Sequence, residues 1–155
     1  MKKITAALLA GIMTLSLLAG CEFTDQLAER AADMKAITTE MRKSQEVQVI
    51  REEDKTVIAT LNTQEEISQL FEEMNLAVNW KLVQNPKSET VSYRCVLSQD
   101  DTQHFGEDKS DVEQSEIMEM VFYQDVPYIT LILGNVSLHF QMDKNIDPFF
   151  ESLES

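Results

Sequence analysis

Glycine is scarce in this chain of 155 residues: it has four, and only Gly106 and Gly134 lie beyond residue 20. Glycine-rich loops that bring the backbone close to a phosphate are therefore missing, which disfavours a nucleotide site built in that way. The sequence also lacks the G-x-S-x-G, H-E-x-x-H and C-x-x-C motifs, which mark hydrolase nucleophiles, zinc peptidases and dithiol sites. We therefore predict a protein that is not an enzyme, with no catalytic residues and no cofactor.

Positive charge is also scarce. The chain has 13 lysines and arginines against 27 aspartates and glutamates, and its formal net charge is −14. Such a surface repels nucleic acids, anionic lipid headgroups and polyanionic wall polymers. We interpret the excess of carboxylates as a well-solvated exterior, in preference to a specific cation-binding surface.

The residues that a metal site would use are not grouped. His104 and His139 lie apart, whereas a zinc site needs three or four ligands at compact spacing. A calcium-binding EF-hand has acids at alternating positions before its glycine and a glutamate that closes the loop. The acidic loop from Asp100 to Asp111 has neither feature. We predict no metal site. A cation-dependent enzyme that uses this loop with His104 is the less favoured alternative.

Long hydrophobic runs are absent as well. The uncharged run from Ile4 to Leu18 spans about 15 residues, which is shorter than the roughly 20 that a membrane-spanning helix needs. It follows Lys2 and Lys3, and small residues lead from it to Cys21. A positive start, a short apolar stretch and small residues at the end are typical of a cleaved export signal.

The segment Leu18-Ala19-Gly20-Cys21 resembles the lipobox of bacterial lipoproteins. The resemblance implies that residues 1–20 are a signal peptide that is removed and that Cys21 carries a diacylglycerol on its thiol. Its new amine is often acylated as well, with fatty acids such as palmitate. The protein is then expected at the cell membrane, anchored by lipid on the extracytoplasmic face. The type of envelope stays open.

Loss of residues 1–20 changes two further expectations. The mature chain has 135 of the 155 residues, which is enough for one domain with a real core. Because Lys2 and Lys3 are lost, the net charge changes from −14 to −16. With Cys21 lipidated, Cys95 has no partner for a disulfide. Its place in the alternating run Val91 to Leu97 predicts a small buried hydrophobic residue and not a reactive thiol.

Residues 22–44 are predicted to form a helix after the lipid anchor. Apolar side chains recur there at steps of three and four residues, and no glycine or proline interrupts them. These apolar residues are Phe23, Leu27, Ala31, Met34, Ile37 and Met41. Two interpretations stay open for the segment 21–45: a helical stalk that lifts the domain off the membrane, or a helix that packs on it.

Residues 46–155 are predicted to form a single α+β domain. We expect a mostly antiparallel sheet of about five to six strands with one amphipathic helix packed on a face. Thr63 and Glu66 form the pattern of a capping box that begins this helix, at about residues 64–75. Gly134 and Asn135 predict a two-residue hairpin turn, most simply of type II′. The expected strands are 46–51, 56–60, 78–82, 91–97, 115–124, 128–133 and 136–142, and a short helical turn follows Asp147 and Pro148.

Several central strand positions are apolar on both faces, so one helix cannot cover them all. Met118, Met120 and Phe122 lie on one face of the expected strand 115–124. Trp80 alternates with polar residues in the expected strand 78–82. Residues of this kind at strand spacing usually face a core. If the face stays uncovered, however, Met118, Met120 and Phe122 are the candidates to line a ligand groove.

The region of residues 46–153 resembles small uncharacterised domains of Gram-positive lipoproteins. The resemblance rests on the helix start Thr63–Ile67, the pair Trp80-Lys81 and the strand Tyr128-Ile129-Thr130. It implies fold and surroundings but no activity. We predict a membrane-anchored, non-enzymatic binding or interaction module of unknown ligand, whose partners are the membrane and an envelope protein and not nucleic acid. The alternative is a regulatory or inhibitory lipoprotein that acts on a neighbouring envelope protein.

Overall fold

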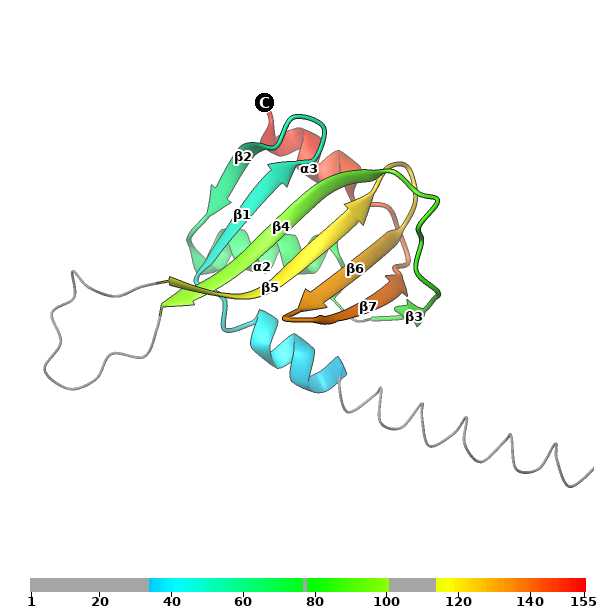
Figure 1. Cartoon of the computed structure of the whole chain (residues 1–155). Coiled ribbons are helices and arrows are strands. Elements are labelled where there is room, and N and C mark those ends of the chain that lie inside the picture. Colours follow the sequence, from blue (N-terminus) through cyan, green and yellow to red (C-terminus); the bar gives the residue numbers. More distant parts are fainter. Residues whose placement is uncertain (1–33, 77, 101–113) are drawn as a thin grey trace, which may run out of the picture. The chain divides into compact units, whose positions relative to one another are not determined.

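The computed structural model describes residues 34–76, 78–100 and 114–155 (Figure 1). The chain forms two compact units, Met1–Ile37 and Thr38–Ser155. The fold described below is that of the second unit. None of the helices within the described ranges combines the length and the hydropathy needed to cross a bilayer.

Several predictions lie outside the described residues. They are the signal segment 1–20, the lipidated Cys21, the start of the predicted helix 22–44, and His104 with its acidic loop. The last part of that helix is described: residues 34–41 are helical, and the side chain of Met41 is fully buried. The final turn, which belongs to the second unit, therefore packs and does not project into solvent.

The unit is α+β and is built on one antiparallel sheet of seven strands in the order β2-β1-β4-β5-β6-β7-β3. The predicted class is confirmed, and the sheet has one strand more than the five to six expected. The shortest strand is β3, which covers only two residues of the predicted strand 78–82 and lies at the edge beside β7. The strands are β1 (Glu46–Arg51), β2 (Thr56–Leu61), β3 (Lys81–Leu82), β4 (Val91–Asp100), β5 (Gln114–Tyr123), β6 (Tyr128–Leu133) and β7 (Val136–Gln141).

One hairpin, one three-stranded meander and two pairings between distant segments, β1 with β4 and β3 with β7, produce this strand order. β1 and β2 form a hairpin, and β5, β6 and β7 form a meander. Gly134 in the last hairpin turn has a φ of 57°, whereas Asn135 does not have a positive φ, as a type II′ turn requires. β4 joins the two parts because it pairs with β1 on one side and with β5 on the other.

Helix α2 (Gln64–Glu73) begins at the predicted capping box. The Glu66 backbone N–H donates to Thr63 Oγ1 at 3.3 Å, and the Thr63 N–H donates to the Glu66 carboxylate at 3.2 Å. These two bonds satisfy N–H groups that the first turn of a helix leaves without a partner. The Glu66 carboxylate also accepts from the Thr63 hydroxyl, and this bond, followed by those from the Thr63 and Asn62 N–H groups, lowers the pKa of Glu66 because it favours the ionised carboxylate.

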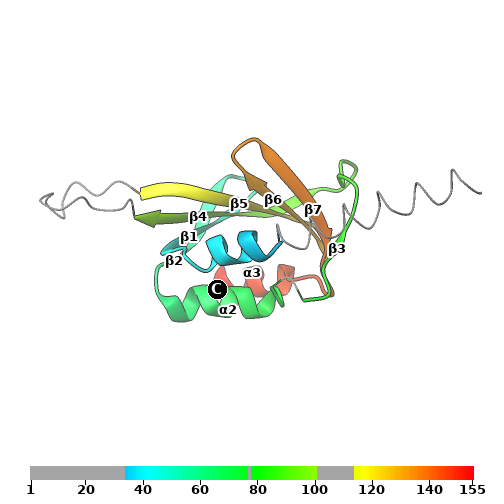
Figure 2. The ribbon, with the colours of Figure 1, turned by 90° about the horizontal axis from the view of Figure 1, so that it is seen from below.

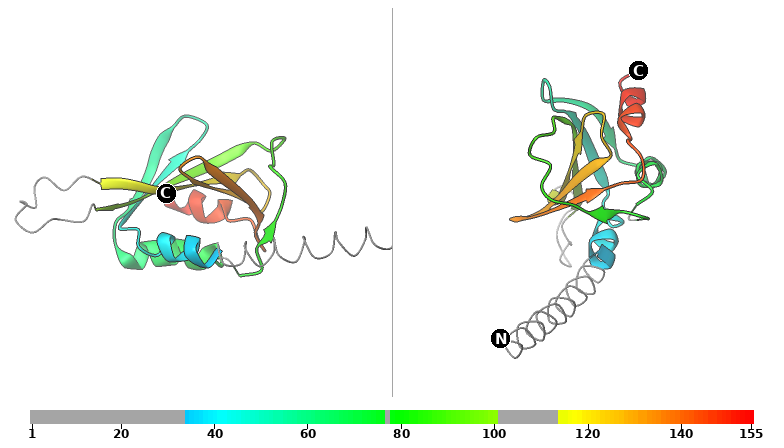
Figure 3. Two further views of the ribbon diagram at one scale, coloured as in Figure 1. Left: turned by 60° about the horizontal axis from the view of Figure 1, so that its bottom comes forward. Right: turned by 90° about the vertical axis from the view of Figure 1, so that its right-hand side faces the viewer.

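Helices α2 and α3 (Asp147–Leu153) both lie on the same face of the sheet (Figure 2; Figure 3, right). α2 buries Ile67, Leu70 and Phe71. α3 buries Phe150 completely, and the Phe150 ring lies 4.9 Å from that of Phe122 and 4.7 Å from that of Tyr93. Both distances are typical of favourable aromatic pairs. The core therefore lies between this face and the two helices.

The opposite face of the sheet is more polar and carries neither α2 nor α3. Arg94 of β4 forms ion pairs there with Glu52 and Glu119. On β6, Thr130 faces this side, opposite Val121, and its side chain is buried. The second apolar face expected from the sequence is therefore a mixed one, packed by side chains of the strands themselves.

Replacing the cap of α2 provides a test of this local interaction. Thr63→Ala removes the side-chain acceptor, and the free energy of unfolding should fall by about 1 kcal/mol. Ser68→Ala, at an exposed position inside the same helix, serves as the control and should cost nothing, because alanine favours a helix. Equal stability of Thr63→Ala and wild type in urea unfolding would rule out a role of the capping box in stability.

Candidate functional site

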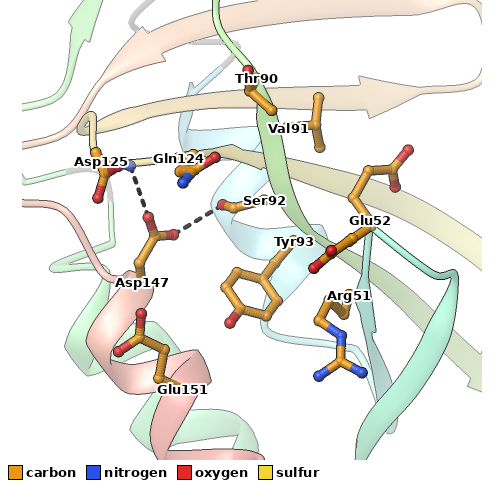
Figure 4. A pocket seen from close by; sticks show the side chains of 11 residues that line it. Arg51, Glu52, Thr90, Val91, Ser92, Tyr93, Gln124, Asp125, Asp147 and Glu151 are labelled. Carbon is orange, nitrogen blue, oxygen red and sulfur yellow. Dashed lines mark hydrogen bonds between the residues drawn. The ribbon is translucent and has the colours of Figure 1, made fainter.

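A pocket of about 630 Å³ lies where β1 ends and β4 begins (Figure 4). The β1–β2 turn, the start of β4, the β5–β6 turn and the first turns of α3 surround it. Most of its side chains are polar, and five are carboxylates. The lining residues are Arg51, Glu52, Glu53, Thr90, Val91, Ser92, Tyr93, Gln124, Asp125, Asp147 and Glu151.

The strand register explains why these segments meet. Arg51, the last residue of β1, is opposite Tyr93 near the start of β4. Tyr123, the last residue of β5, is opposite Val91. Because neighbouring strands are antiparallel, the turn after β1, the turn after β5 and the segment before β4 all fall at one end of the sheet.

Asp147 connects α3 to this end of the sheet and is 7% exposed. Its carboxylate accepts hydrogen bonds from the hydroxyl of Ser92 at 2.9 Å and from the backbone N–H of Asp125 at 2.9 Å (Figure 4). The side-chain amide of Asn145 donates a third at 3.3 Å. A buried carboxylate needs such donors to offset the loss of water. We interpret Asp147 as the residue that positions α3 as one wall of the pocket.

Arg51 and Glu154 connect the other end of α3 to β1. The Arg51 guanidinium donates to both oxygens of Asp54, at 2.7 and 3.1 Å, and to Glu154 at 2.9 Å. The bond with Asp54 raises the pKa of Arg51 and lowers that of Asp54. The hydroxyl of Tyr93 also donates to Glu154, at 3.0 Å. Burial, followed by the neighbouring Glu154 carboxylate, raises the pKa of Tyr93 to about 12, so the phenol stays protonated.

The remaining carboxylates give the pocket its charge. Glu53, Asp125 and Glu151 make no side-chain hydrogen bond or ion pair with any other described residue. Glu52 is already engaged by Lys55 and Arg94, and its hydrogen bond with Lys55 is the main cause of its lowered pKa. Arg51 is the only cation among the lining residues, and it is held by Asp54 and Glu154. The potential in the pocket therefore favours positively charged groups over anions.

The polar groups that line the pocket are carboxylates, hydroxyls, one amide and one guanidinium. No histidine or cysteine lines it. Cys95 lies in the core with no exposed surface, and this burial raises the pKa of its thiol. Nor do the described ranges hold any group of three or more histidines, cysteines or acids placed to bind a metal ion. The arrangement can bind and orient a ligand through charge and hydrogen bonds.

The groove candidates predicted from the sequence are core residues. Met118, Met120 and Phe122 are at most 1% exposed, and alternation along β5 puts all three on the face where Phe122 contacts Phe150 of α3. Trp80 is half-buried: its ring lies 5.7 Å from that of Phe140, and its indole N–H donates to the Met74 carbonyl at 3.2 Å. The chain's own helices therefore occupy the space where a groove was considered, and we do not propose these residues for binding.

Sequence reasoning missed the pocket. The signals that could have revealed it were the acidic residues that follow β1 and β5, namely Glu52, Glu53 and Asp125, and the aspartate that begins α3. Each of these segments was identified only as a turn or a helix start. They meet because β4 lies between β1 and β5, and no local pattern in the sequence gives that strand order.

Comparison with known protein families, curated proteins and solved structures finds no significant match to this chain. The resemblance of residues 46–153 to domains of Gram-positive lipoproteins therefore stays a prediction.

Substitution of Asp147 should test its role at the pocket wall. Asp147→Ala leaves the Ser92 hydroxyl and the Asp125 N–H without their acceptor, so the free energy of unfolding should fall by about 1–3 kcal/mol. Asp147→Asn retains one acceptor oxygen, so its free energy of unfolding should lie between those of wild type and Asp147→Ala. Asp125→Asn removes a charge from the same pocket but keeps the backbone N–H, and should change stability by less than about 0.5 kcal/mol. Chemical unfolding measures all three; a stable Asp147→Ala variant contradicts the assignment.

Proposed function

We propose that this protein is a lipid-anchored, extracytoplasmic binding or interaction module without catalytic activity of its own. The observation that carries the proposal is Leu18-Ala19-Gly20-Cys21 at the end of a short apolar run that follows Lys2 and Lys3. An export signal of this kind places the rest of the chain outside the cytoplasm. Two or three acyl chains on Cys21 hold a protein stably, because each buried methylene contributes about 0.8 kcal/mol.

The pocket supports the binding part of the proposal. It is concave, and rigid strands and α3 position its polar groups, which is the usual construction of a binding site. The pocket also lies at the C-terminal end of β1. This strand begins at Glu46, opposite Ser98, and ends at Arg51, opposite Tyr93. At about 3.3 Å per residue, the two ends of this strand are about 17 Å apart. The pocket is therefore at the end of the sheet remote from the residue where β1 begins.

The charge of the pocket indicates the kind of partner. Glu53, Asp125 and Glu151 face a partner with no cation of their own to neutralise them. A positively charged group, such as a lysine or arginine side chain of an envelope protein, complements them. Anionic headgroups and wall polymers do not.

The anchor is tested at Cys21. Mass spectrometry of the membrane-extracted protein should find an N-terminal peptide that begins at Cys21 and carries the mass of a diacylglycerol. Cys21→Ser should remain unlipidated and should partition into the aqueous phase of a detergent extract. Cys95→Ala is the matched control, because Cys95 is buried in the core and its loss should leave lipidation unchanged. A wild-type protein that lacks the lipid and partitions with the aqueous phase contradicts the proposal.

The binding part is tested with a photo-crosslinking amino acid in living cells. Placed at Glu151 in the pocket, it should give a discrete adduct that Glu53→Lys abolishes, since the substitution reverses a pocket charge. Glu65 of α2 is exposed and is not one of the residues that line the pocket. The same amino acid placed at Glu65 should give no such adduct. The same adduct from both positions, or one that survives Glu53→Lys, argues against the pocket as the binding site.

A further inference from the structure

Three side chains form a continuous hydrogen-bond chain on the sheet face opposite to α2 and α3. Thr130 of β6 and His139 of β7 are directly opposite each other, and Thr130 is also opposite Val121 of β5. Tyr123 lies two residues beyond Val121 and therefore points to the same side. The Tyr123 hydroxyl lies 2.8 Å from Thr130 Oγ1, which lies 2.8 Å from His139 Nδ1.

Burial makes this chain sensitive to where its protons are. Tyr123 is 7% exposed and Thr130 is 4% exposed, whereas His139 is half-buried. With a neutral imidazole that carries its proton on Nε2, Nδ1 accepts from Thr130, and Thr130 accepts from Tyr123. Both hydroxyl hydrogens then have an acceptor, and the chain is complete.

A proton on Nδ1 of His139 breaks this order. The imidazole must then donate to Thr130, so the Thr130 hydrogen has to turn away from Nδ1. It either turns toward Tyr123, which displaces the Tyr123 hydrogen, or it points elsewhere. Among the described residues neither hydroxyl has another partner. One buried hydroxyl therefore loses its acceptor, and such a loss is unfavourable.

The surroundings do not compensate the added charge. Lys81 of β3 is opposite Gln141 and so lies on the same face as His139, where it supplies no negative charge to pair with an imidazolium. Glu119 of β5 lies on this face too, but it is paired with Arg94. The other titratable side chain on this face of β6 is that of Tyr128, which is opposite Gln141. Desolvation also lowers the pKa of His139, in the direction that the chain requires.

We propose that the Tyr123–Thr130–His139 chain is an acid-sensitive link that fastens β6 and β7 to β5. Above the ordinary titration range of histidine the chain is complete and stabilises the three strands. Acidification protonates His139 and opens the link. A group held neutral in the folded state contributes stability that is complete above the unfolded pKa of 6.5 and declines as the pH falls below it.

NMR of the imidazole tests the chain directly. The experiment uses a His104→Gln background, so that His139 is the only histidine. At about pH 7.5 its Nδ1 should be unprotonated, and its pKa should lie below 6.5. Thr130→Val removes the hydrogen bond while it keeps the burial, so the pKa of His139 should rise toward 6.5. Thr130→Ser keeps the hydroxyl and should restore the wild-type value. A pKa that Thr130→Val leaves unchanged means that burial acts alone, and it overturns the proposal.

Stability provides a second readout that does not depend on the threonine variants. The folding equilibrium constant of wild type should fall by about threefold or more between about pH 7.5 and about pH 5 because of His139. His139→Asn places an amide oxygen near the position of Nδ1 and cannot be protonated, so it should lose that part of the pH dependence. His104→Gln should retain it. If the pH dependence of His139→Asn equals that of wild type, the link is not acid-sensitive.

Discussion

The buried carboxylate of Asp147 is the constraint on which much of this structure depends. It gathers the hydroxyl of Ser92, the N–H of Asp125 and the amide of Asn145 at one point. Because Asp147 is also the first residue of α3, these bonds decide where the helix lies. In that position Phe150 contacts the aromatic side chains of Tyr93 on β4 and Phe122 on β5. The same carboxylate therefore closes the core on one side and forms a wall of the pocket on the other.

The two faces of the sheet are held by different physical means. On the face of α2 and α3, side chains such as Leu97, Met120 and Leu131 are removed from water, and the hydrophobic effect dominates. On the opposite face, the partners are specific: Arg94 joins Glu52 to Glu119, and Thr130 joins Tyr123 to His139. Burial of apolar area tolerates small displacements, whereas these bonds require defined distances and protonation states. A change of pH therefore affects the bonds of the polar face more than the packing of the apolar face.

The local elements were largely predictable. The capping box at Thr63 and the apolar spacing that follows it gave a helix at 64–75, and α2 spans Gln64–Glu73. The strand 128–133 matches β6. β3, in contrast, covers only Lys81–Leu82 of the predicted strand 78–82. Val78 is exposed and Asn79 adopts a φ of 59°, which no strand accommodates, so alternation of side chains alone was a misleading signal there.

The functional regions were predictable only in part. The anchor at Cys21 is a property of a short contiguous motif, so the sequence alone is enough to propose it. The pocket is not, because its residues come from four segments between Arg51 and Glu151. Likewise, Met118 was a candidate for an open groove because its face needed a cover, and the sequence did not show that both helices supply it.

The sequence by itself determined helices α2 and α3, most strands, the hairpin turn at Gly134 and the likeness of the N-terminus to a lipobox. Each of these depends on side chains and backbone bonds within about ten residues of one another. Tertiary structure alone decided that α2 and α3 share a face, that β4 lies between β1 and β5, and that Tyr123, Thr130 and His139 meet. These arrangements depend on contacts between residues far apart in the chain, and on which of several apolar surfaces excludes water best. Local patterns do not carry that information.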